Sequence, residues 1–255
     1  MLGSGGGNGE DIRPAYQAFR QWLDRQPDNR VLRKSEQAEN FFRKIGITFN
    51  VYGEDEADER LIPFDVVPRV LSGNEWRKLS KGIEQRVRAI NAFLHDIYHR
   101  QEILRAGRIP QSLIANNDAF LPKMMGFDPP GGIYTHIIGT DIVRTGPDEF
   151  YVLEDNARTP SGVSYMLENR EIMLQMFPEL FAEIPICEVS DYPSWLRRSL
   201  SACAPPACMG RPTVAVLTPG TYNSAYFEHS FIADQMGAEL IEGSDLRVVD
   251  GRVAM

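Results

Sequence analysis

The chain has 255 residues, 43% of them hydrophobic and 24% charged, an ordinary composition for one large globular domain or two smaller ones. Its net charge of −8 argues against a general nucleic-acid-binding surface, because such a surface needs a basic face. No apolar run approaches the roughly 18 residues that a membrane-spanning helix needs. We therefore expect neither nucleic acid nor a membrane as a partner.

The first ten residues, MLGSGGGNGE, have the composition of a flexible arm and lack the basic and apolar segments of a secretion signal. The cysteines are Cys187, Cys203 and Cys208, an odd number placed late in the chain. This pattern argues against a disulfide framework. We expect a cytoplasmic protein whose cysteines are reduced.

Two helices are predicted over residues 11–44, the first from apolar residues at helical spacing such as Phe19 and Trp22. Gly46 is placed to end the second helix. A longer helix is predicted to begin after Ser72 or Asn74, either of which can cap it, and to break near Gly82.

His95 and His99 lie four residues apart on this longer helix, so that both side chains fall on one face. Two such histidines could ligate a metal ion. Because the neighbouring sequence offers no third ligand, we favour exposed or packed helix histidines instead.

The second half of the chain begins with two predicted strands, at 134–144 and 149–156, joined by the turn TGPD. The remaining predicted elements, in chain order, are a helix at 164–180, a helix at 192–202, a Pro-rich linker at 202–212, a strand at 213–220, a helix at 224–237, and strands at 238–243 and 246–255.

The two predicted strands carry the residues with the clearest chemistry. Glu154 and Asn156 project from one face of a strand, since alternate side chains share a face about 6.6–6.8 Å apart. Folding the chain at the TGPD turn brings Asp141 within about one residue of the position opposite Glu154. Three oxygen ligands then converge, a set that suits one Mg²⁺ ion or a pair of them. The alternative is a polar strand end that only terminates a sheet edge. Asp155 and Arg144 point to the other face and are poorer candidates.

The chain after Asn156 enters the segment ARTPSG. Arg158 is placed to reach a phosphate or acyl-phosphate oxygen. Ser161 and Gly162 can offer hydroxyl and backbone donors at the start of the next helix, which is a natural anion site.

Three segments, HIIGTDIVR, FYVLEDNARTPSGVSYMLENR and VLTPGTYNSAYFEH, resemble the circularly permuted ATP-grasp proteins, which are related to glutathionylspermidine synthases. The likeness extends from about Arg13 to the C-terminus. It implies an α/β (α+β) fold, an antiparallel ATP-grasp sheet with flanking helices followed by the start of a Rossmann-like unit. It also matches Asp141, Glu154 and Asn156 to the family's ligands for the Mg²⁺ ions of Mg-ATP.

The resemblance implies an ATP- and Mg²⁺-dependent ligase that joins a small-molecule or peptide-like carboxylate to an amine through an acyl-phosphate. Arg158 would hold the acyl-phosphate, whereas Asn223 and Ser224, at a glycine turn before a helix, would contact the acceptor substrate. Glu228 and His229 lie inside that helix, where packing or surface roles are more common. Lys123, just before the hairpin, is expected to be a surface residue.

The predicted domains are a flexible arm at 1–10, an ATP-grasp-like portion at 11–201, and the start of a pre-ATP-grasp α/β domain at 212–255. The family's nucleotide-clamping lobe is expected partly beyond residue 255, so weak binding of Mg-ATP by this chain alone is expected. Two other functions stay open: a non-catalytic nucleotide- or peptide-binding protein, and a kinase-like phosphotransferase that stops at a phosphorylated product.

Overall fold

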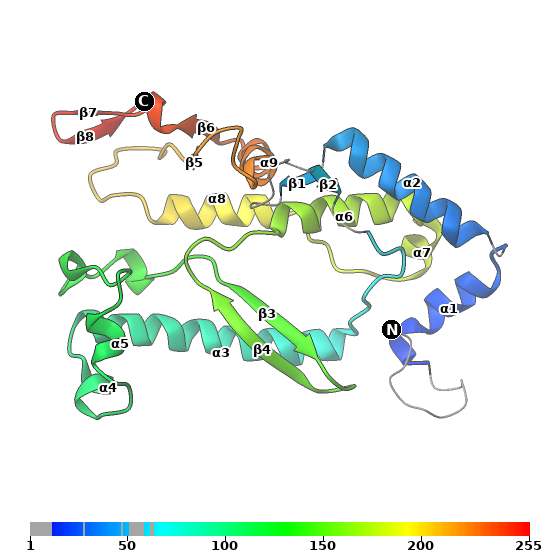
Figure 1. The fold of residues 1–255 in the computed structure, drawn as a ribbon, viewed down its shortest axis with the longest axis horizontal. Coiled ribbons are helices and arrows are strands. Elements are labelled where there is room, and N and C mark those ends of the chain that lie inside the picture. Colours follow the sequence, from blue (N-terminus) through cyan, green and yellow to red (C-terminus); the bar gives the residue numbers. More distant parts are fainter. Residues whose placement is uncertain (1–11, 28, 47, 51–58, 62–63) are drawn as a thin grey trace. The chain divides into compact units, whose positions relative to one another are not determined.

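The computed structural model describes residues 12–27, 29–46, 48–50, 59–61 and 64–255 (Figure 1). The predicted arm at 1–10 lies outside the described residues. The fold mixes helices and strands, as predicted, and the described strands pair into two-stranded sheets. The chain divides into two compact units, Met1–Leu71 with Ser161–Met255, and Ser72–Pro160.

The first unit contains both ends of the chain. Its helices are η1 (Pro14–Tyr16), α1 (Gln17–Asp24), α2 (Arg30–Ile45), α6 (Val163–Met176), α7 (Pro178–Glu183), α8 (Tyr192–Ala202), α9 (Tyr226–Met236) and η4 (Gly243–Asp245). Its strands are β1 (Thr48–Asn50), β2 (Glu59–Leu61), β5 (Ala215–Thr218), β6 (Glu239–Glu242), β7 (Arg247–Val249) and β8 (Arg252–Ala254).

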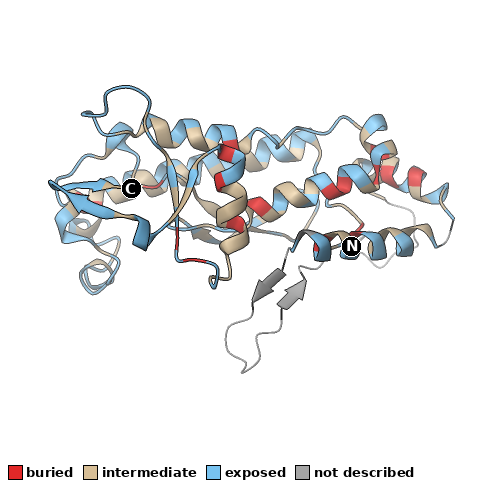
Figure 2. Cartoon of the chain, turned by 90° about the horizontal axis from the view of Figure 1, so that it is seen from above, coloured by how far each residue is buried: buried red, intermediate tan, exposed pale blue. Residues whose placement is uncertain are grey.

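The core of the first unit forms where the apolar faces of helices meet. Phe19 and Trp22 of α1, predicted from helical spacing, are both buried and pack with residues that include Phe177. The rings of Trp22 and Phe177 meet edge to face with centroids 5.1 Å apart, a favourable arrangement for an aromatic pair. Buried positions, red in Figure 2, accordingly lie mainly on helices rather than strands.

One predicted detail of the first unit, the end of its second helix, is confirmed. Helix α2 ends at Gly46, whose φ of +76° places it in the left-handed region that favours glycine. Strands β5 and β6 are parallel neighbours joined through α9, and β7 pairs with β8 as a hairpin.

The predicted linker at 202–212 has residues of this same unit on both sides. The predicted domain boundaries therefore stay predictions.

The second unit is built on one long helix. Its helices are α3 (Gly73–Tyr98), α4 (Glu102–Arg105), α5 (Ser112–Ala115), η2 (Pro122–Met124) and η3 (Pro130–Gly132), and its strands are β3 (Gly139–Arg144) and β4 (Phe150–Asn156). Ser72 caps α3 in a reciprocal arrangement, since its side chain accepts from the Glu75 N–H while the Glu75 carboxylate accepts from the Ser72 N–H.

Two predictions for the second unit are wrong. Helix α3 runs through Gly82 without a break. A single internal glycine makes a helix only about 1 kcal/mol less stable than alanine would, which the rest of this long helix can offset. The first strand begins at Gly139 rather than at residue 134. The backbone N–H groups of Tyr134 and Thr135 donate instead to Oδ1 of Asn91 on α3, at 2.8 and 3.2 Å, so they are engaged away from a strand partner.

None of the helices that the structure describes is long and apolar enough to cross a membrane.

Candidate functional site

The β3–β4 hairpin has the predicted antiparallel pairing. Gly139 lies opposite Asn156 and Thr140 opposite Asp155, and the register then shifts before Ile142, which lies opposite Val152. Asp141 sits at this irregularity, across from the Leu153–Glu154 step. A bulge of this kind re-aims side chains, and bulges are common beside functional sites.

The two faces of the hairpin differ in exposure. Along β3 and β4, exposed positions include Asp141, Glu154 and Asn156, whereas Thr140 and Asp155 are partly buried. The amide nitrogen of Asn156 donates to Oε1 of Glu154 at 3.3 Å, so these two side chains share a face as predicted. The amide oxygen of Asn156 and the carboxylates of Asp141 and Glu154 are exposed, and oxygen ligands of this kind suit a hard cation.

Exposed apolar side chains accompany these oxygens on the two strands. Leu153 is 71% exposed, Tyr151 58% and Val143 37%. Apolar surface of this extent beside convergent polar groups is typical of a ligand-binding surface.

The β3–β4 hairpin lies beside α3 (Figure 1). Charged side chains on its inner face form ion pairs with residues of that helix. Asp155 accepts from Nε of Arg86 at 3.2 Å and from the Thr140 hydroxyl at 2.9 Å. The hydrogen bond from Arg86 is the main cause that holds the pKa of the Asp155 carboxyl below its ordinary value. Arg144 of β3 donates to Glu75 of the α3 capping box.

This arrangement confirms that Asp155 and Arg144 face away from Asp141. Both strands are thus anchored from behind by ion pairs with α3. The ion pairs of Asp155 and Arg144 therefore set the orientation of the hairpin on α3. The side chains of Asp141, Glu154 and Asn156 take no part in these ion pairs.

Gly139 allows Pro160 to pack closely against the open end of the hairpin. A Cβ atom on this residue would lie 2.8 Å from Cβ of Pro160, closer than real Cβ contacts come. Pro160 ends the segment that carries Arg158, so this contact places the chain beyond β4 against the start of β3.

We expect Gly139→Ala to lower the free energy of unfolding by about 1–2 kcal/mol, because the added methyl group must displace Pro160. Gly82→Ala in α3 is the matched control, since nothing lies within 4 Å of the position that its methyl group would take. That change should stabilise the helix by about 0.5–1 kcal/mol. Chemical denaturation of both variants measures the difference, and equal stability of Gly139→Ala and the unchanged chain would contradict the tight contact.

The Arg158 side chain is exposed two residues beyond Asn156, and Lys123 in η2 is also exposed, as expected for a surface residue. Glu154 and Asn156 thus share one face, and Asp141 is exposed on the neighbouring strand, across from the Leu153–Glu154 step. Arg158 follows them along the chain.

Ser161 and Gly162 lie in the first unit, directly before α6. The N–H of Gly162 donates to Oε2 of Glu228 at 2.7 Å, and the N–H of Ser164 donates to the same oxygen at 3.4 Å. Glu228 is only 6% exposed. The N-terminus of α6 thus already holds an anion from within the chain, and a nucleotide role for Ser161 and Gly162 stays a prediction.

Asn223 and Ser224 precede α9 in the first unit. Oδ1 of Asn223 accepts from the N–H of Ala225 at 2.9 Å, a local turn that leads into the helix. His229, one helical turn on, has its Nδ1 2.9 Å from the buried Thr218 hydroxyl, which agrees with a packing role. Contact of Asn223 and Ser224 with an acceptor substrate stays a prediction.

Sequence reasoning missed Arg86, and it gave Glu228 a packing or surface role without its partner on the chain before α6. Each acts across more than sixty residues of sequence, on Asp155 and Gly162 respectively. No local spacing pattern could have indicated either pairing.

Comparison with known families gives a match over residues 68–255 to the family described as circularly permuted ATP-grasp type 2. The matched residues are well over half of the chain and include the whole β3–β4 hairpin. The chain belongs to the circularly permuted ATP-grasp family.

Several proteins of other organisms are similar in sequence to this chain. An uncharacterized protein of Synechocystis sp. is 46% identical over 95% of the chain and 50% of its own length. An uncharacterized protein of Mycobacterium tuberculosis is 50% identical over 82% of the chain and 37% of its own length. A Frankia alni protein, provisionally named glutamate–cysteine ligase 2-3, is 40% identical over 94% of the chain and 28% of its own length.

The chain thus spans half or less of the length of these relatives. The name of the Frankia protein describes a much longer chain than the part matched here.

Proposed function

We propose that the protein carrying this chain is an ATP- and Mg²⁺-dependent carboxylate–amine ligase, and that the exposed face of the β3–β4 hairpin holds the metal of Mg-ATP. The observation that carries the proposal is the shared face of Glu154 and Asn156, with Asp141 exposed on the paired strand across from the Leu153–Glu154 step. Membership of the ATP-grasp family and the ligase name of one relative support it.

The donor set fits Mg²⁺ on chemical grounds. Two carboxylates and one amide oxygen are hard ligands, and Mg²⁺ commonly takes one or two carboxylates together with phosphate oxygens and water. Bound there, Mg²⁺ would neutralise negative charge on the terminal phosphates of ATP. Histidine and cysteine, which favour softer metals, are missing from β3 and β4.

The chain's own residues would then position the reactants. Arg158 follows the hairpin with an exposed guanidinium, whose planar fork suits phosphate oxygens. A carboxylate oxygen of the substrate attacks the γ-phosphorus of ATP, which forms an acyl-phosphate and releases ADP. The amine then attacks the acyl carbon, so that an amide bond forms and inorganic phosphate leaves.

This chemistry needs alignment and charge stabilisation but no protein nucleophile. Apolar Leu153 and Tyr151, exposed on the same hairpin, would help to exclude water from the acyl-phosphate once a substrate covers them. Water exclusion matters because hydrolysis would waste the activated acid.

The experiment that tests the proposal is identification of the nucleotide product in the protein carrying this chain. Amino acids, short peptides and polyamines serve as acids and acceptors, with glutamate and cysteine as one pair suggested by the Frankia relative. We expect ADP and inorganic phosphate in amounts equal to the amide formed, and only when Mg²⁺ is present. AMP and pyrophosphate would contradict the mechanism, a stable phosphorylated acid would indicate a phosphotransferase, and bound but unreacted ATP would indicate a binding protein.

A further inference from the structure

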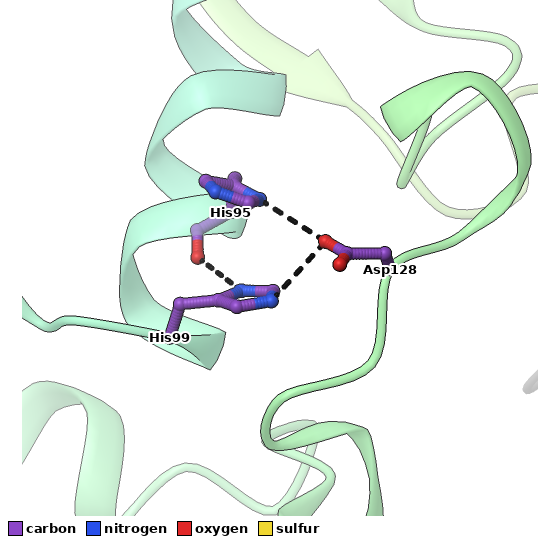
Figure 3. A group of neighbouring side chains, drawn as sticks. All are labelled: His95, His99 and Asp128. Atoms are coloured by element: carbon purple, nitrogen blue, oxygen red, sulfur yellow. Dashed lines mark hydrogen bonds and ion pairs between the residues drawn. The ribbon is translucent and has the colours of Figure 1, made fainter.

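A second group of potential metal ligands lies in the second unit, away from the exposed hairpin oxygens in sequence. His95 and His99 near the end of α3 and Asp128, between η2 and η3, point toward one another (Figure 3). Their ligand atoms all lie within 4.8 Å of each other. Asp128 is the third ligand that the sequence near the two histidines lacks.

The hydrogen bonds of His99 fix which of its nitrogens faces Asp128. Its Nδ1 lies 2.9 Å from the backbone carbonyl oxygen of His95, which can only accept, so Nδ1 carries the proton. The lone pair of the neutral ring is therefore on Nε2. That nitrogen lies 3.2 Å from Oδ1 of Asp128.

Two electron-rich atoms at this separation need a cation between them. Either a second proton or a metal ion can fill this role. A histidine that ligates a metal commonly donates its other N–H to a carbonyl or carboxylate, and the bond from His99 to the His95 carbonyl has this form.

The rest of the group favours a metal ion over a proton alone. Nδ1 of His95 also approaches Oδ1 of Asp128, at 3.9 Å. A shared proton satisfies one nitrogen, whereas a metal ion accepts both imidazoles and the carboxylate together. In a tetrahedral zinc site, bonds of about 2.0–2.1 Å place ligand atoms about 3.3 Å apart, so shifts below about 1.5 Å would complete the set.

The segment that carries Asp128 is held in place by other contacts. The N–H of Gly126 donates to the carbonyl of Tyr98 at 2.8 Å, and the N–H of Leu121 donates to the Tyr98 hydroxyl at 3.2 Å. The Tyr134 hydroxyl oxygen lies 3.3 Å from the Phe127 carbonyl oxygen and 3.3 Å from Nδ1 of His95, and its one proton can be donated to either. The three ligands are therefore supported by backbone and aromatic contacts. Nε2 of His99 is buried, whereas the Asp128 side chain is 77% exposed, so an ion would enter from the Asp128 side.

We propose that His95, His99 and Asp128 bind one divalent transition-metal ion, with Zn²⁺ as the expected occupant. Two imidazole nitrogens and one carboxylate oxygen form a borderline-soft set that suits Zn²⁺ better than Mg²⁺. Bound there, the ion joins the end of α3 to the segment that leads into β3. Its role is independent of the proposed ligase reaction.

The test is calorimetric titration of this chain with ZnCl₂ in excess Mg²⁺, with Co²⁺ absorption as a second probe of near-tetrahedral nitrogen and oxygen ligands. We expect one Zn²⁺ per chain. His99→Ala should weaken zinc binding by about 100-fold or more, and Asp128→Asn by about tenfold or more, since even partners of metal ligands contribute tenfold to 100-fold.

Three controls make the result decisive. His136→Ala removes an exposed histidine from the same unit and should leave zinc affinity unchanged. Glu154→Gln should also leave it unchanged, and circular dichroism with EDTA present checks that each variant folds. Asp128→Asn alters an exposed side chain and keeps the test valid even where His99→Ala fails to fold. Zinc affinity that is absent, or insensitive to Asp128→Asn, or lost in Glu154→Gln, would overturn the proposal.

Discussion

Glu154→Gln is expected to reduce ATP-dependent turnover by about 100-fold or more in the protein carrying this chain. The change removes one anionic ligand from the proposed metal set, and metal stabilisation of charge on a transferring phosphoryl group is worth several kcal/mol. Glu154 is exposed, and Gln keeps its size, so folding should change by less than about 0.5 kcal/mol. Steady-state ADP release at saturating ATP measures the loss.

The matched control is Asp148→Asn, which removes one negative charge from the turn of the same hairpin. Asp148 contributes its backbone carbonyl to Lys78 of α3, and that contact survives the change. Full turnover in Asp148→Asn with loss in Glu154→Gln assigns the effect to the ligand and not to net charge. Equal turnover in both variants would count against a metal at Glu154.

Glu228→Ala is expected to lower the free energy of unfolding by about 2–3 kcal/mol. The buried carboxylate accepts from the N–H groups of Gly162 and Ser164, and its removal leaves both donors without that partner at the start of α6. The Ser164 hydroxyl still donates to the Glu228 backbone carbonyl, so part of the link between α6 and α9 remains.

Urea denaturation measures this loss, and Glu239→Ala on β6 is the matched control, because Glu239 is an exposed carboxylate in the same unit. The control should change stability by less than about 0.5 kcal/mol. Similar stability of the two variants would show that the carboxylate of Glu228 is not needed at the N-terminus of α6.

Features set by short-range rules could be predicted from the sequence. The cap at Ser72, the left-handed Gly46 and the hairpin turn each depend on residues a few positions apart. The shared face of Glu154 and Asn156 follows from strand alternation alone. For these features the local preference and the final fold agree.

The errors arose where a distant partner decided the local structure. Residues 134–138 have the composition of a strand, but Asn91 of α3 takes the backbone N–H groups of Tyr134 and Thr135. The helix continues through Gly82 because its neighbours on both sides are good helix formers.

The same limit applies to the candidate sites. Asp128 approaches His99 only because the chain between them turns back on α3, a path that spacing does not reveal. Arg86 and Glu228 likewise act on residues far along the chain. The resemblance to a family pointed to the candidate metal ligands on the hairpin, but it carried no information on what anchors that hairpin.

The central claim is that the exposed face of the β3–β4 hairpin holds the metal of the nucleotide. Crystals of the protein carrying this chain, grown with Mn²⁺ and a non-hydrolysable ATP analogue, test it most directly through the anomalous signal of manganese. We predict a manganese peak about 2 Å from carboxylate oxygens of Asp141 and Glu154, with phosphate oxygens completing its coordination. A nucleotide bound with its metal elsewhere, while Asp141 and Glu154 face solvent, would contradict the claim.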